Sequence, residues 1–142
     1  MRTHVVSDEH CRETLSDAEW DALATEAWKR RRNAFVLGNT KVGAAAMCGG
    51  GAIFGGCNVE HRYRCHDVHA EVNAISTMVA CGHTDLVAVL VAAEKEFFTP
   101  CGGCMDWILQ FGGPGCLVAY QSQEGGDLRV FRAGDLMPHY PR

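Results

Sequence analysis

The segment that decides the fold is Leu86-Val87-Ala88-Val89-Leu90-Val91, an unbroken apolar run that contains three valines. Such a run is typical of a β-strand that is covered on both faces. A segment with apolar residues at helical spacing precedes it, from His69 to Cys81, and ends at Gly82. A second helical segment follows it, from Pro100 to about Phe111, and begins with a proline. The sequence therefore predicts a central strand between two helices.

Further elements surround this centre. A capping box, Ser16-Asp17-Ala18-Glu19, begins a helix, and Gly49-Gly50-Gly51 supplies the tight turn of a β-hairpin. The predicted ranges are 17–33 for the helix and 42–47, 52–57, 116–120 and 128–132 for the strands. Strands and helices alternate, so the predicted fold class is α/β, with helices packed on a mixed sheet. The length of 142 residues suits a single domain over positions 1–142.

The bulk properties disfavour several classes of protein. Hydrophobic residues make up 47% of the chain and charged residues 21%, and no apolar run approaches the roughly 20 residues that cross a bilayer. The stretch up to Asp17 lacks the apolar core of a secretory signal, so we expect a cytoplasmic protein. A net charge of −4 gives no general attraction to nucleic acid. A disulfide framework suits small secreted domains, and this chain has enough apolar residues for a core and no export signal. The eight cysteines are therefore interpreted as reduced thiols or metal ligands.

The chemistry is expected at Pro100-Cys101-Gly102-Gly103-Cys104, which places two thiols at the start of a predicted helix. The partial positive charge of a helix N-terminus favours thiolates, and deprotonated sulfur is what zinc binds. The spacing of Cys101 and Cys104 also occurs in redox sites and in structural zinc sites.

The segment His69-Ala70-Glu71 sharpens this interpretation. His69 offers a third ligand, and Glu71 offers a carboxylate that need not touch the metal. Three protein ligands leave one position open, as in catalytic zinc sites, whereas structural sites close with four. In the pattern H-x-E…P-C-x-x-C the chain resembles zinc deaminases. We therefore predict about one Zn²⁺ held by His69, Cys101 and Cys104, with Glu71 as the proton shuttle. A structural zinc module without catalysis is the alternative from another class.

From about residue 42 to 111 the chain resembles the cytidine deaminase family. The resemblance rests on four motifs in the family's order: Val42-Gly43-Ala44-Ala45, Cys57-Asn58-Val59-Glu60, His69-Ala70-Glu71 and Pro100-Cys101-Gly102-Gly103-Cys104. It implies a three-layer fold, a mixed five-stranded sheet with helices on both faces, and assembly into a dimer or tetramer. It also implies that Asn58 and Glu60 hold the ribose 3′-hydroxyl. The implied reaction is hydrolytic deamination of cytidine, deoxycytidine or a close analogue, with release of ammonia.

The chain departs from the family pattern at several positions. Many members carry a cysteine in place of His69 and an arginine in place of Val72; two thiolates and a neutral imidazole need no such compensating cation. Thr40 stands where an aromatic residue near the base is common, and Met105 follows Cys104 where the family has arginine. A nucleoside antibiotic, as for blasticidin S deaminases, is therefore an alternative substrate. Deamination of a nucleotide or RNA is another, supported by Arg62 and Arg64.

Overall fold

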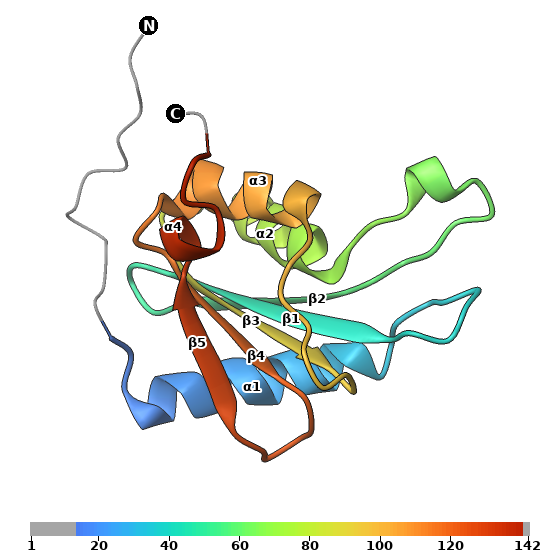
Figure 1. Cartoon of the computed structure of the whole chain (residues 1–142), viewed down its shortest axis with the longest axis horizontal. Helices are drawn as coiled ribbons and strands as arrows, with labels where there is room; N and C mark the ends of the chain where they lie inside the picture. The colour runs from blue at the N-terminus through green and yellow to red at the C-terminus, as the bar shows by residue number, and fades with distance from the viewer. Residues whose placement is uncertain (1–13, 141–142) are drawn as a thin grey trace, which may run out of the picture.

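The computed structural model describes residues 14–140 and places five strands in one mixed sheet (Figure 1). The strands are β1 Val42–Cys48, β2 Ile53–Cys57, β3 Leu86–Ala93, β4 Leu117–Gln121 and β5 Leu128–Arg132. Their spatial order is β2-β1-β3-β4-β5. All neighbours are antiparallel except β3 and β4, which are parallel. The predicted central strand is confirmed, because β3 is the middle strand and every one of its residues is buried.

Helices cover both faces of this sheet. They are α1 Asp17–Arg31, α2 Ala70–Ala80, α3 Gly102–Gly112 and the short α4 Ala133–Leu136. Helix α1 lies on one face, where its buried residues pack with Met47 and Leu90. Helices α2 and α3 lie on the opposite face, where Ile75 and Ile108 pack with Val89 (Figure 1). The alternation of side chains along β1 and β3 therefore supplies two separate apolar cores, and the predicted three-layer α/β architecture is confirmed.

Two glycines allow the helices to approach the sheet closely. A Cβ atom at Gly43 in β1 would overlap the carbonyl oxygen of Ala27 in α1. A Cβ atom at Gly56 in β2 would lie 2.5 Å from the backbone nitrogen of Ala74 in α2. Real side chains do not tolerate such contacts, so any larger residue would push the helix outward. Gly56 thereby fixes the height of α2 above the sheet, and α2 carries part of the candidate site at its N-terminus.

Element boundaries differ from the predicted ones by a few residues. The capping box is confirmed, since Ser16 Oγ accepts a hydrogen bond from the N–H of Glu19, but α1 ends at Arg31 instead of residue 33. Pro100 lies outside α3, because Cys101 is its N-cap. The sequence patterns did not predict α4 or the 3₁₀ turn Arg64–His66.

None of the cysteines within residues 14–140 forms a disulfide. Cys48 and Cys116 are buried among apolar side chains, whereas Cys65 and Cys81 are exposed. Cys11 lies outside the described residues. No helix within residues 14–140 is long and apolar enough to cross a membrane.

Candidate active site

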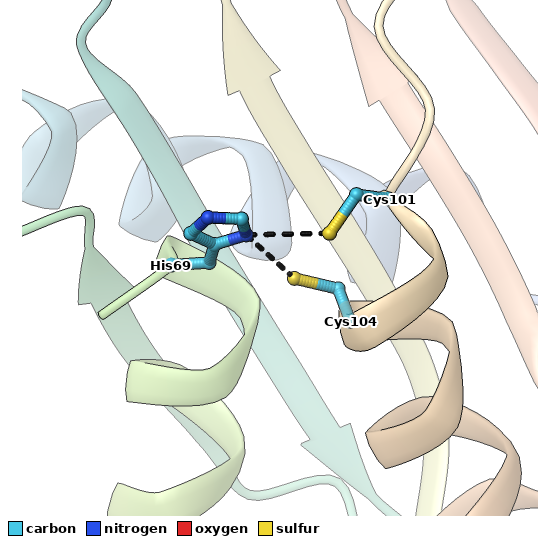
Figure 2. A group of neighbouring side chains, drawn as sticks. All are labelled: His69, Cys101 and Cys104. Atoms are coloured by element: carbon cyan, nitrogen blue, oxygen red, sulfur yellow. Dashed lines mark hydrogen bonds between the residues drawn. The ribbon is translucent and has the colours of Figure 1, made fainter. Parts of the chain in front are cut away.

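The starts of α2 and α3 meet over the sheet and bring three predicted ligands together (Figure 2). His69 is the N-cap of α2, Cys101 is the N-cap of α3, and Cys104 lies in the first turn of α3. The His69 Nδ1 atom lies 3.3 Å from the Sγ atom of Cys101 and 3.3 Å from the Sγ atom of Cys104. Cys101 and Cys104, which lie 32 and 35 positions after His69 in the chain, therefore converge with it on one point.

The chemistry of these three atoms fits zinc. All three lie within 4.8 Å of one another, and zinc bonds of about 2.3 Å to sulfur and about 2.0 Å to nitrogen can be made with small side-chain rotations. Two thiolates and one neutral imidazole balance the charge of a divalent ion. Cys104 is buried, whereas His69 and Cys101 are exposed, so the set is open on the side of the pocket. This openness is what a catalytic zinc site needs for its fourth position.

The electrostatics of Cys104 correct one expectation. The helix N-terminus was expected to favour the thiolate, but burial raises the pKa of the Cys104 thiol well above its ordinary value. The nearby carboxylate of Glu71 and the sulfur of Cys101 raise it further. Burial therefore outweighs the partial charges at the start of α3. A divalent cation between the sulfurs reverses this balance, because metal binding replaces the thiol proton.

Glu71 lies in the second position of α2 and is almost completely buried, with 3% of its surface exposed. Its Oε2 atom accepts a hydrogen bond of 3.4 Å from the thiol of Cys104. Burial raises the pKa of the Glu71 carboxyl above the usual glutamate value. A carboxyl group in this environment exchanges protons closer to neutral pH, as a general acid-base group must.

A pocket of about 280 Å³ opens beside these residues. Its lining is mixed: it includes His69, Cys101 and Glu71 together with further polar and apolar side chains. The other lining residues are Thr40, Val42, Asn58, Glu60, Arg64, Asp67, Val68, Ala70, Phe98 and Thr99. Five of the six predicted site residues therefore line this pocket. The sixth, Cys104, contacts both His69 and Glu71.

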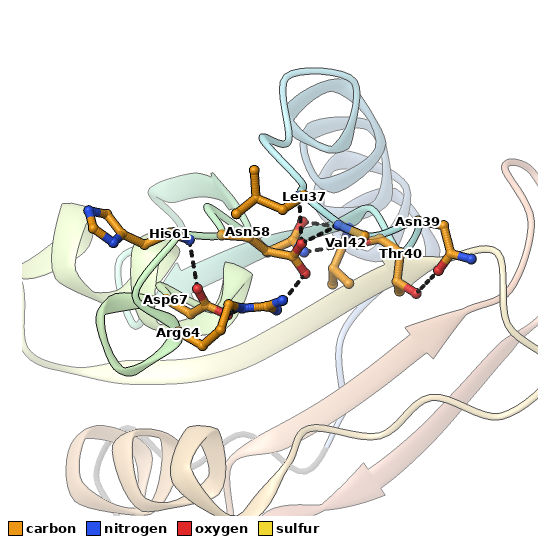
Figure 3. A network of polar contacts seen from close by, with 10 residues as sticks. Leu37, Asn39, Thr40, Val42, Asn58, His61, Arg64 and Asp67 are labelled. Carbon is orange, nitrogen blue, oxygen red and sulfur yellow. Dashed lines mark hydrogen bonds and ion pairs between the residues drawn. The ribbon is translucent and has the colours of Figure 1, made fainter.

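Asn58 is buried at the end of β2 and ties the pocket wall together (Figure 3). Its Oδ1 atom accepts a hydrogen bond of 2.9 Å from the N–H of Val42, and its Nδ2 atom donates one of 2.9 Å to the carbonyl of Thr40. The amide still has one N–H and one lone pair for a ligand. The residue thus has a structural task that the sequence motif did not reveal.

Glu60, Arg64 and Asp67 form a charged group in the lining of the pocket, and Figure 3 shows Arg64 beside Asp67. Glu60 Oε1 accepts hydrogen bonds from the N–H groups of Leu37 and Gly38, and these bonds hold the pKa of Glu60 below its usual value. Arg64 pairs with Glu60 Oε2 at 3.1 Å and with Asp67 Oδ2 at 2.8 Å. Its guanidinium is therefore engaged on both sides, and the group carries one net negative charge.

Several pocket residues were missed by the sequence analysis. Phe98 and Thr99 precede Cys101 on the connection from β3 to α3, and Val68 precedes His69. Position next to a ligand is the only signal that could have indicated them. Thr40 stands where the family commonly has an aromatic residue near the base, and Phe98, from another segment, lines the same pocket.

Comparisons with known proteins agree with this geometry. Residues 16–120 match the family described as the cytidine and deoxycytidylate deaminase zinc-binding region. The chain is 31% identical to the cytidine deaminase of Sporosarcina psychrophila over 83% of this chain and 88% of the relative. It is 29% identical to that of Mycobacterium tuberculosis, over 87% of this chain and 90% of the relative. The crystal structure of cytidine deaminase from Burkholderia pseudomallei superposes with a TM-score of 0.77 at 32% identity, over 88% of this chain and 98% of that one.

Replacing Cys104 by serine should remove the zinc ion of this centre. A serine hydroxyl is a poor zinc ligand, and two remaining ligands hold the ion weakly. Metal analysis of purified protein should show a loss of about one zinc per chain relative to the unchanged protein. Cys81→Ser, which removes an exposed thiol elsewhere, is the matched control and should keep its zinc. Full zinc content in Cys104→Ser would contradict the assignment.

Proposed function

Because the chain belongs to the cytidine and deoxycytidylate deaminase family, we propose that it is a zinc-dependent hydrolase that deaminates cytidine or deoxycytidine and releases ammonia. The observation that carries the proposal is the placement of Glu71, a buried carboxyl beside the metal ligands and at the wall of the pocket. A structural zinc site has no use for such a group. The alternative of a zinc module without catalysis is therefore disfavoured.

The residues of the site divide the work of the reaction. His69, Cys101 and Cys104 would hold the zinc ion, which supplies the polarisation that lowers the pKa of water towards about 7. Glu71 takes the proton of the attacking water and delivers it to N3 of the cytosine ring. It then takes the remaining proton of that water, from the oxygen now bonded to C4, and passes it to the amine that leaves C4. The C4–N bond is broken, a C4–O bond is formed, and water and cytidine give a uracil-type nucleoside and ammonia.

The remaining pocket residues are assigned to substrate orientation. Phe98 and Val42 offer apolar surface for the flat base. Asn58 and Glu60 are proposed to bind the ribose hydroxyls, with the free N–H of the Asn58 amide as donor and the Glu60 carboxylate as acceptor. The lowered pKa of Glu60 keeps it ionised and therefore a strong acceptor.

The charged end of the pocket favours an unphosphorylated substrate. Arg64 already binds Glu60 and Asp67, so a 5′-phosphate would have to compete with two carboxylates. The carboxylates would also repel it. The residues 29–32 at the end of α1 are all basic, but they offer RNA little, since Arg30 pairs with Glu26 and Arg32 with Glu124. Nucleosides are thus preferred over nucleotides and RNA.

Assembly into a homo-oligomer is also part of the proposal. Large apolar side chains are exposed on the segments that flank the pocket, at Phe35, Leu37, Val59 and Tyr63, with Phe35 59% and Tyr63 60% exposed. Phe35 and Val59 are joined by main-chain pairing, as are Val59 and Val68. A patch of this kind on a small domain is typical of a protein interface. A cytoplasmic location and a single domain over positions 1–142 stay predictions.

Glu71→Gln should retain the fold and the zinc ion but lose most turnover, because an amide fills the same space and cannot carry protons. The expected loss in kcat is about 10²–10⁴-fold. Ammonia release from cytidine, measured together with zinc content, checks this. Near-normal turnover in this variant would mean that another group moves the protons.

Substrate preference should follow the charge of the pocket. Steady-state kinetics on cytidine, deoxycytidine, their 5′-monophosphates and blasticidin S, at two salt concentrations, should give a nucleoside the highest kcat/KM. The monophosphates should be worse by about tenfold or more. Asp67→Asn should narrow that gap, and Arg62→Ala is the control for loss of a nearby cation. A monophosphate that is the best substrate, with an advantage that Arg64→Ala removes, would overturn the preference for nucleosides.

The exposed apolar patch should control oligomerisation. Light scattering after size exclusion should show a dimer or tetramer for the unchanged protein, and Tyr63→Ser or Phe35→Ser should shift it towards the monomer. Val130→Ser, at an exposed position of β5 far along the sheet, should leave the mass unchanged. A monomeric unchanged protein at all accessible concentrations would exclude the interface.

A further inference from the structure

We infer that Cys48, His83 and Asp85 form a second, structural metal site that takes a borderline divalent cation such as Zn²⁺. The ligand atoms of these three side chains lie within 4.8 Å of one another. They come from three segments: the end of β1, the turn after α2 and the approach to β3. Spacing along the sequence gave no indication of this group, because Cys48 lies 35 residues before His83.

Cys48 is fixed by the β1–β2 hairpin. It is the last residue of β1 and only 1% exposed. Its N–H donates to the carbonyl of Ala52 at 3.0 Å, and its carbonyl accepts a hydrogen bond of 2.9 Å from Gly51. The backbone that carries the sulfur is thus held on both sides.

His83 is fixed by the end of α2. Gly82 has a positive φ of 94°, its N–H donates to the carbonyl of Val79, and the N–H of His83 donates to the carbonyl of Met78. These two bonds are the Schellman closure of a helix. The imidazole ring lies against Phe54, with ring centroids 5.5 Å apart. The side chain therefore leaves the helix end in a defined direction.

Asp85 is fixed by the same hairpin turn that holds Cys48. The N–H of Gly49 lies 3.0 Å from the carbonyl oxygen of Asp85 and 3.1 Å from its Oδ2 atom, and donates to both. A hydrogen bond to a ligating carboxylate orients it and is a frequent outer-shell contact at metal sites. Asp85 and His83 are half-buried, so an ion can enter and a water molecule can complete the coordination.

The ligand set selects the class of metal. One sulfur, one imidazole nitrogen and one carboxylate oxygen suit zinc or cobalt, whereas magnesium and calcium require oxygen ligands. Binding replaces the thiol proton of Cys48, which is released to solvent, and the thiolate and carboxylate then neutralise the divalent charge. Tetrahedral zinc places its ligands about 3.3–3.8 Å apart, so modest side-chain rotations complete the site.

The proposed site is separate from the candidate active site. His69 stands at the N-terminus of α2 and His83 just beyond its C-terminus, and the 11 residues of α2 span about 16 Å. An ion bound at Cys48, His83 and Asp85 would join the β1–β2 hairpin, the end of α2 and β3. The expected role of this ion is to stabilise the packing of these three segments. The inference does not depend on the proposed reaction.

The test is metal stoichiometry of the full chain. The protein is dialysed against Zn²⁺, returned to metal-free buffer and analysed for zinc. The unchanged protein should hold two ions per chain, and His83→Ala and Asp85→Asn should each hold one while keeping deaminase activity. His139→Ala, which removes an exposed histidine elsewhere, is the matched control and should hold two. His69→Ala should lose only the other ion.

A second readout is thermal unfolding in the His69→Ala background, in which added Zn²⁺ should raise Tm only while His83 is present. One ion per unchanged chain would overturn the inference. Two ions in both His83→Ala and Asp85→Asn would also overturn it, because the second ion would then lie elsewhere. If His83→Ala does not fold, the metal content of Asp85→Asn decides the question alone, because this change is isosteric and lies at a half-buried position. If the unchanged protein holds two ions and shows no deaminase activity, that result would count against the proposed function only.

Discussion

The convergence of two helix N-termini over one face of the sheet is the constraint on which the rest of the site depends. His69 Nδ1 lies 3.3 Å from two sulfurs only because α2 and α3 pack on the same face and begin beside one another. Small residues permit this packing, above all Gly56, where a side chain would strike the backbone of α2. The ligand geometry is thus a consequence of how closely the helices can approach the sheet.

Burial gives the site its chemical character. Glu71 and Cys104 are both shielded from solvent, and for both the pKa is raised by that shielding. In water a glutamate and a thiol ionise independently, whereas here a carboxyl, a thiol and a second sulfur compete for one small volume. A divalent cation resolves this competition by taking the place of the thiol protons. The same burial that makes the Cys104 thiol reluctant to ionise therefore makes the site selective for a metal that binds thiolates strongly.

Much of the fold was predictable, because its signals are local. The continuous apolar run at β3, the capping box at Ser16 and the glycine after α2 each reflect hydrogen bonding or burial within a few residues. The metal ligands were predictable because zinc chemistry restricts residue type and spacing together. Phe98, Asp67 and the second task of Asn58 were not, because a contact across the pocket leaves no periodic trace in the sequence. The burial of Cys104 was not predictable for a related reason, since burial depends on what packs around the helix start and not on the motif itself.

The single parallel pair in the sheet affects the order in which the protein folds. β3 and β4 can pair only after the chain has crossed over through α3, and β1 pairs with β3 across a long stretch of sequence. Such non-local contacts are slow to form, because the entropy cost of closing a large loop comes before any stabilising contact is made. The donors of the zinc centre lie 32 and 35 residues apart, and they meet because α2 and α3, which flank β3 in the chain, pack on the same face of the sheet. We therefore expect zinc to bind after α2 and α3 have packed on the sheet, and not to initiate folding.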